Sequence, residues 1–173
     1  SRQRMATLDL ITLTEAKQEI AAVNVDVDDV LLAGYISAVS QMIDNRCGPV
    51  VARTITDETH EVEQTSSIRL RVYPVLSVTT VDEFTREGTQ TTLTLDTLAS
   101  KHANGCYLVP RKWGRTLERR NAGAAYVYPP YGAVRVTYEA GRCASTAAVP
   151  ELFKHAARLA VATNWSIQQG SGS

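Results

Sequence analysis

The stretch IRLRVYPVLSVTTV, residues 68–81, decides the fold class of this chain. Its first five residues alternate apolar and polar side chains strictly, and after Tyr73-Pro74 the residues 75–81 are rich in β-branched side chains. Period-two alternation is typical of a strand with one buried face, and β-branched residues favour strands. The same region predicts further short strands at residues 92–95, 106–109 and 133–138.

Helical signals precede the strands. Thr12 and Glu15 form a capping-box pattern, which predicts a helix over about residues 13–22. A second helix should open at Asp26, Asp28 and Asp29, because carboxylates suit the positive end of a helix dipole, and should end at Gly48-Pro49. Apolar residues at helical spacing predict its buried face: Val30, Leu31, Tyr35, Ala38, Val39, Met42 and Ile43.

A third helix should follow the strands. Pro150 suits a first helical turn, and the chain after it is helical in pattern. The residues expected on one buried face are Leu152, Phe153, Ala156, Leu159, Ala160 and Thr163. Beyond Thr163 the amphipathic pattern is lost, although Trp165 and Ile167 are large and apolar.

Strands grouped between helices indicate an α+β fold. We expect two N-terminal helices, a central antiparallel β-sheet with a long loop or hairpin between residues 109 and 133, and a C-terminal helix. Residues 1–168 should form a single domain, with 169–173 as a flexible tail. No window of 18 apolar residues and no secretory h-region is present, so neither a transmembrane helix nor a signal peptide is expected.

Charge is balanced overall but uneven along the chain. The 18 basic and 18 acidic residues cancel, whereas residues 1–67 hold 11 acids and 5 bases. A neutral chain is a poor general binder of nucleic acid. Opposite halves favour either lateral association between copies or neutralisation within one copy, and the sequence leaves both open.

The sequence contains no pattern of an assembled catalytic, cofactor or metal site. His60, His102 and His155 stand on different elements, and no His or Cys pair has metal-ligand spacing. We expect three reduced thiols at Cys47, Cys106 and Cys143, and no catalytic, cofactor-binding or metal-binding residue.

One segment concentrates positive charge, and its residues are Arg111, Lys112, Trp113, Arg115, Arg119 and Arg120. Three interpretations are open: a solvated loop with Trp113 on the sheet, a protein-docking loop, or a nucleic-acid contact in which the indole stacks on a base.

Landmarks along residues 8–168 resemble one known family. They are the LITLTEAK entry at 10–17, the DDVLL helix start at 28–32, the YPVLSVTTV strand at 73–81, and the VRVTYEAG and VPEL segments at 134–141 and 149–152. This order is similar to that of the head–tail connector, or adaptor, proteins of tailed bacteriophages. The stretch 111–131 departs from any pattern of that family.

The resemblance implies a structural virion protein at the capsid–tail junction, made in the bacterial host cytoplasm. It implies a homo-oligomeric ring, usually dodecameric, that lies beneath the portal and extends the DNA channel. The implied partners are the portal protein, a tail or stopper protein, and double-stranded DNA that passes without sequence recognition.

The expected docking residues lie in two segments, an apolar one near the C-terminus and the basic one at 111–120. Related connectors insert a C-terminal segment into the portal, which here places Trp165, Ile167 and Gln168 at the portal. The basic segment at 111–120 would lie on an interface or at the channel mouth. The alternatives are a small nucleic-acid-binding module acting through that segment, or an enzyme whose site forms between subunits.

Overall fold

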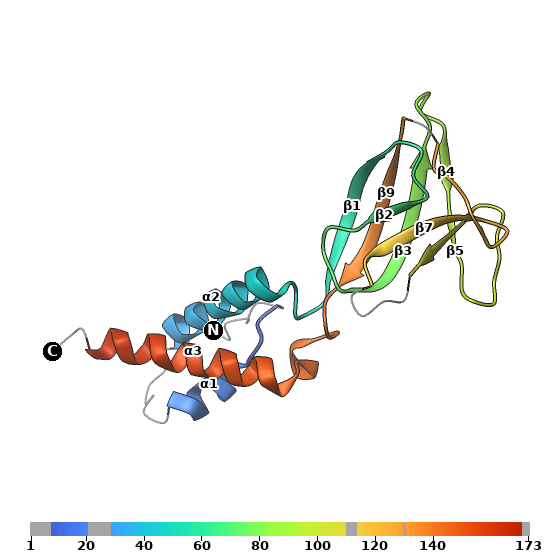
Figure 1. The fold of residues 1–173 in the computed structure, drawn as a ribbon. Coiled ribbons are helices and arrows are strands. Elements are labelled where there is room, and N and C mark those ends of the chain that lie inside the picture. Colours follow the sequence, from blue (N-terminus) through green and yellow to red (C-terminus); the bar gives the residue numbers. More distant parts are fainter. Residues whose placement is uncertain (1–7, 21–28, 110–113, 130, 171–173) are drawn as a thin grey trace. The chain divides into compact units, whose positions relative to one another are not determined.

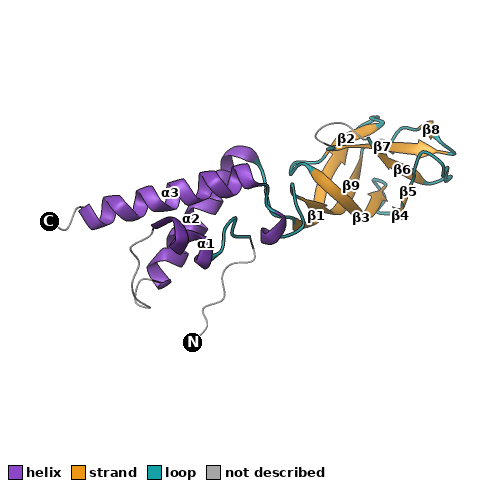
Figure 2. Cartoon of the chain, turned by 90° about the horizontal axis from the view of Figure 1, so that it is seen from below, coloured by secondary structure: helices purple, strands orange, loops and turns teal. Residues whose placement is uncertain are grey.

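A computed structural model describes residues 8–20, 29–109, 114–129 and 131–170. The chain divides into two compact units: a helical unit of residues 1–52 and 142–173, and a strand unit of residues 53–141. Within the described ranges, the helices belong to the first unit and the strands to the second (Figures 1 and 2). In sequence, the strand unit is therefore inserted between α2 and α3. That the two units together form a single domain stays a prediction.

The helical unit contains α1 (Leu13–Ile20), α2 (Asp29–Cys47), the 3₁₀ turn η2 (Thr146–Ala148) and α3 (Glu151–Gly170). The capping box is confirmed, because the Glu15 amide donates to Thr12 Oγ1 at 3.2 Å and the Thr12 amide donates to Glu15 Oε2 at 2.7 Å. The Lys154 ammonium also reaches Glu15 at 2.8 Å and so joins α3 to the start of α1. Of the described residues, no helix is long and apolar enough to cross a membrane.

The buried faces of α2 and α3 agree with the predicted ones only in part. The residues that pack in the helical core are Leu32, Ile36 and Val39 of α2 and Ala157, Val161 and Trp165 of α3. Part of the prediction is confirmed, because Val39 is buried and Tyr35, Ile43, Phe153 and Ala160 pack partly buried against this core. Both helices are apolar on more than one side, so helical spacing alone selected the rest of the set wrongly. The predicted residues that are in fact exposed are Val30, Leu31, Ala38, Met42, Leu152, Ala156, Leu159 and Thr163.

The described residues of the strand unit form nine strands: β1 (Arg53–Val62), β2 (Ser67–Arg69), β3 (Val75–Phe84), β4 (Gln90–Thr92), β5 (Thr94–Leu95), β6 (Gly105–Leu108), β7 (Thr116–Asn121), β8 (Ala124–Ala125) and β9 (Gly132–Ala140). They form two sheets, in the orders β1-β9-β3-β4 and β2-β7-β6-β5, with β8 paired to β7. All pairs are antiparallel except β5 with β6, which confirms the α+β class.

The strand core lies between the two sheets. Its fully buried members include Leu70, Val81, Leu117, Val134 and Tyr138. The strand predicted at 68–72 is shorter than expected and ends at Arg69, although the Leu70 amide still donates to the Arg115 carbonyl at 2.8 Å. The strand predicted at 92–95 is split by the buried Leu93 into β4 and β5.

Candidate functional site

The thiol and imidazole groups of the strand unit do not form a reactive pair. His102 Nδ1 lies 2.6 Å from Asp96 Oδ1, but the Cys106 thiol points to the Thr94 carbonyl oxygen at 3.8 Å. Burial, followed by the nearby Asp96 charge, raises the pKa of Cys106 to about 12. The thiolate is therefore scarce at neutral pH, and this geometry does not suit a nucleophile. Among the described residues, no group of three His, Cys, Asp or Glu side chains could hold a metal ion.

Glu58 is the centre of a buried polar cluster on β1. Its carboxylate accepts hydrogen bonds from the Tyr138 hydroxyl at 2.7 Å and from the Arg71 amide at 2.9 Å, and His60 Nε2 lies 2.6 Å away. The Val72 amide in turn donates to the Tyr138 hydroxyl at 3.1 Å. Burial by itself raises the pKa of Glu58, but these hydrogen bonds outweigh it and the pKa falls below its ordinary value of 4.5. The cluster ties the bulged strand β1 to residues 71–72.

We expect Glu58 to make the strand unit sensitive to acid. A carboxyl whose folded pKa is lowered stabilises the fold above pH 4.5, and that contribution disappears as the pH falls through the folded pKa. Urea unfolding between pH 7 and pH 3 should show a loss of stability that Glu58→Gln reduces. Glu61→Gln, which alters an exposed carboxylate on the same strand, should leave the wild-type slope in place. A Glu58→Gln curve parallel to the wild type would contradict this.

The basic segment is not one exposed loop. Arg111, Lys112 and Trp113 lie outside the described residues, whereas residues 116–121 form strand β7. The Arg115 guanidinium lies 4.4 Å from the centre of the Tyr73 ring, and that of Arg120 lies 3.9 Å from the centre of the Tyr107 ring. These two arginines stack on aromatic rings of their own unit, which lowers their availability for a nucleic-acid backbone.

Arg119 is buried and satisfied within the strand unit. Its guanidinium forms two 2.9 Å hydrogen bonds with the Glu83 carboxylate, from Nε to Oε2 and from Nη2 to Oε1. It also donates to Asn104 Oδ1 at 3.2 Å and to the Gly105 carbonyl at 3.3 Å. Because only 3% of Arg119 is exposed, the predicted role of this residue at an interface has no support from its position. Alternation along β7 places it on the core face with Leu117, a pattern that the sequence contains but that the surrounding charges obscured.

The three residues predicted to dock on a portal have different environments. Trp165 is buried, and its ring meets that of Tyr35 edge-on at 6.4 Å. Ile167 is 65% exposed, and Gln168 is also exposed. Trp165 is therefore a core residue of the helical unit, and the docking role of the three residues stays a prediction.

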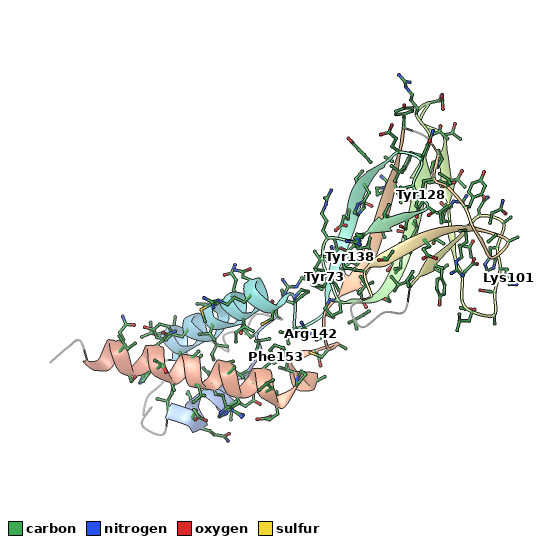
Figure 3. All side chains as sticks on the ribbon, viewed as in Figure 1. Tyr73, Lys101, Tyr128, Tyr138, Arg142 and Phe153 are labelled. Carbon is green, nitrogen blue, oxygen red and sulfur yellow. The ribbon has the colours of Figure 1, made fainter. Side chains whose placement is uncertain are left out.

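The helical unit also has exposed apolar residues that sequence analysis assigned to its core. Leu152 and Leu159 lie on α3, and Val30, Leu31 and Met42 lie on α2. By contrast Phe153, on the neighbouring side of α3, is covered by the Arg142 guanidinium at 5.6 Å (Figure 3). Single exposed apolar residues are ordinary, but rows of them along a helix mark a contact surface.

The strand unit also has an exposed surface, and this one is rich in tyrosine. Tyr126, Val127 and Tyr131 are each about half exposed or more, in the segment between β8 and β9. A hollow of about 560 Å³ lies beside this segment and is lined by Gln64, Ala125, Tyr126, Val127, Tyr128 and Pro129. Tyrosine is enriched at protein interfaces because it combines a large apolar ring with a hydroxyl.

Comparison with known proteins identifies the fold class and then particular structures that share it. No family model and no curated protein matches the chain. The fold is that of a chain in the neck of an empty gene transfer agent (GTA) particle computed with C6 symmetry, at a TM-score of 0.64 and 20% identity, covering 95% of this chain and 83% of that one.

Two further structures agree. A chain in the virion of a native gene transfer agent particle has a TM-score of 0.62 and 21% identity, and covers 91% of this chain and 78% of that one. A chain in the neck of a native particle computed with C12 symmetry has a TM-score of 0.59 and 21% identity, over 94% of this chain and 84% of that one.

Proposed function

We propose that this chain is a structural component of the neck of a tailed, phage-like particle. It would form a homo-oligomeric ring, of the connector or adaptor type, beneath the portal and join the capsid to the tail. One observation carries the proposal. Chains from the neck or virion of gene transfer agent particles share this fold over 91–95% of the present chain.

A passive role agrees with the chemistry of the described residues. Burial raises the pKa of the enclosed Cys106 thiol to about 12, and the polar clusters around Glu58 and Arg119 bond within their own unit. A channel for double-stranded DNA should let the duplex slide. A chain with zero net charge binds the DNA backbone less tightly than a strongly basic channel wall would.

The C-terminal end of α3 is our candidate for docking on the portal. Ile167 offers an exposed apolar side chain and Gln168 an exposed polar one, while the buried Trp165 fixes this last part of the helix on the core. An apolar anchor on a rigid support binds with a lower entropy cost than one on a loose tail. The tail or stopper protein would bind elsewhere on the ring.

The experiment is to assemble particles without this chain and then to supply it. We expect filled heads and free tails in electron micrographs without the chain, and joined particles when it is returned. A chain ending at Ser166 should keep its helical stability yet restore few joined particles. The matched control is Leu98→Ser, which removes an apolar residue that is 85% exposed in the strand unit and should restore joining fully. Normal joining in the absence of the chain would refute the proposed function, and normal joining by the shortened chain would refute the docking site.

A further inference from the structure

We propose that α2 and α3 carry the two different surfaces through which neighbouring copies of this chain contact each other in a ring. The inference rests on the proposed function and assigns the partner, a second copy, to residues outside the portal-docking end. It begins from two rows of exposed apolar residues in the helical unit.

The first row, the α3 row, consists of Leu152, Ala156 and Leu159. Leu152 is 78% exposed and Leu159 48% exposed, and Ala156 between them is exposed as well. Their spacing of i, i+4 and i+7 places them on one side of the helix. The core residues Ala157 and Val161 take other positions of the helix, so the row is not part of the internal packing.

The second row, the α2 row, consists of Leu31, Gly34, Ala38 and Met42. Leu31 and Met42 at its ends are 44% and 48% exposed, and the two small residues between them are exposed. A Cβ atom added at Gly34 would meet nothing within 4 Å, so the backbone there lies open. The side chains of the α2 row are thus small in its middle and large at its two ends.

The two rows are complementary in shape. A large side chain such as Leu159 fits over a low stretch formed by Gly34 and Ala38, in the manner of ridges packed into grooves between helices. Neither row places a charged side chain on its own line of residues. Contact between them would remove apolar surface from water without burying an unpaired charge.

A cyclic ring requires this arrangement of two unlike surfaces. In a ring, one face of each copy meets a different face of the next, whereas a single self-complementary patch closes a dimer. The neck structures with the same fold were computed with C6 and C12 symmetry, which is cyclic. Two unlike, shape-matched apolar rows on one unit are what a second copy in such a ring would need.

Charge offers a weaker explanation of lateral contact. The helical unit holds 8 acids and 7 bases and the strand unit 10 acids and 11 bases, so each unit is nearly neutral. The acidic first part and the basic second part of the sequence therefore do not become one acidic unit and one basic unit. Among the described residues, ion pairs join residues 1–67 to residues 68–173 within one copy, namely Glu15 with Lys154, Glu19 with Arg158, and Asp57 with Arg135. These contacts favour internal neutralisation over charge pairing between copies.

The test uses the full chain with a photo-reactive side chain at the edge of the α2 row. Gln41→p-benzoylphenylalanine places this probe on an exposed polar position of α2. Because cross-linking traps even brief contacts, irradiation should give covalent dimers and higher species. Peptide mapping should join residue 41 to the α3 segment 151–163.

Two variants of α3 sharpen the result. Leu159→Glu in the probe-bearing chain should lower the yield of cross-linked species at least about tenfold, because it buries an unpaired carboxylate in the contact. Asn164→Glu adds the same charge at an exposed position on another side of α3 and should change the yield less than about twofold, since it lies away from the row. Circular dichroism of both variants should match the wild type, because both positions are exposed.

The inference is overturned if the probe gives only monomers, if the cross-links map to the strand unit, or if Leu159→Glu leaves the yield unchanged. This outcome is separate from that of the proposed function. Particles that join normally without the chain while cross-links still connect α2 to α3 would refute the neck role alone. If the chain is needed for joining but gives no such cross-links, only the proposed contact between the α2 row and the α3 row is refuted.

Discussion

Replacing Arg119 with leucine should lower the free energy of unfolding of the strand unit by about 3–5 kcal/mol. The substitution leaves the Glu83 carboxylate, which is 7% exposed, without the two 2.9 Å hydrogen bonds that now satisfy it. A buried charge that loses its only close counter-ion is among the costliest single changes in a folded protein. Urea unfolding at pH 7, followed by tyrosine fluorescence, measures the loss.

Two further variants isolate the cause. Arg120→Leu alters the next residue of β7, whose guanidinium is partly exposed and pairs with Glu118 at 3.3 Å, and it should cost no more than about 1 kcal/mol. The double variant Arg119→Leu with Glu83→Leu removes both charges and should regain most of the stability. A loss below about 1 kcal/mol for Arg119→Leu, or no recovery in the double variant, would show that the pair is not the source.

This result has a practical consequence for tests of the basic segment. A variant that changes Arg119 together with its neighbours would impair assembly through unfolding and would say nothing about an interface. Arg115 and Arg120 are partly exposed, so replacing these two with serine tests the surface role of the segment.

Replacing Trp165 with alanine should destabilise the helical unit by about 3–5 kcal/mol. The indole is 8% exposed, packs in the core formed by α1, α2 and α3, and meets the Tyr35 ring edge-on. Its removal leaves a cavity that the neighbouring helices can fill only in part. Thermal unfolding followed by the helical circular dichroism signal reports this unit separately from the strands.

The control for Trp165 lies two residues further along the helix. Ile167→Ala removes an apolar side chain that is 65% exposed, and it should change stability by no more than about 0.5 kcal/mol. If Trp165→Ala were as stable as Ile167→Ala, the indole would not be a core residue and would again be a candidate for direct docking.

The sequence predicted the order of elements well, because the signals for it are local. The Thr12 and Glu15 capping box, the β-branched residues 75–81 and Pro150 each act on their own segment of chain, and each marks an element that the structure contains. Three strands were not predicted individually: β1 is interrupted by a bulge between Ile55 and Glu58, β7 carries several charged residues, and β8 is only two residues long.

The assignment of helical faces was wrong in part, and for a different reason. Leu32 and Leu159 are equally apolar, and both satisfy helical spacing with their neighbours, yet one is buried and the other is not. Burial depends on which helix packs against which side, and that is a property of the tertiary structure. The same limit applies to Arg119, whose partner Glu83 is 36 residues away in the sequence.

The insertion of the strand unit between α2 and α3 governs the order in which the molecule can be completed. A ribosome releases residues 53–141 before α3 exists, so the strand unit can fold during synthesis while α1 and α2 still lack their third helix. Once folded, the strand unit replaces a flexible loop of that length with a fixed connection. The Ala52 amide then donates to the Cys143 carbonyl at 2.8 Å, directly where the chain leaves and re-enters the helical unit. Folding of the strand unit thus offsets the entropy cost of closing that long loop. The helices can then assemble as if α2 and α3 followed each other directly in the sequence.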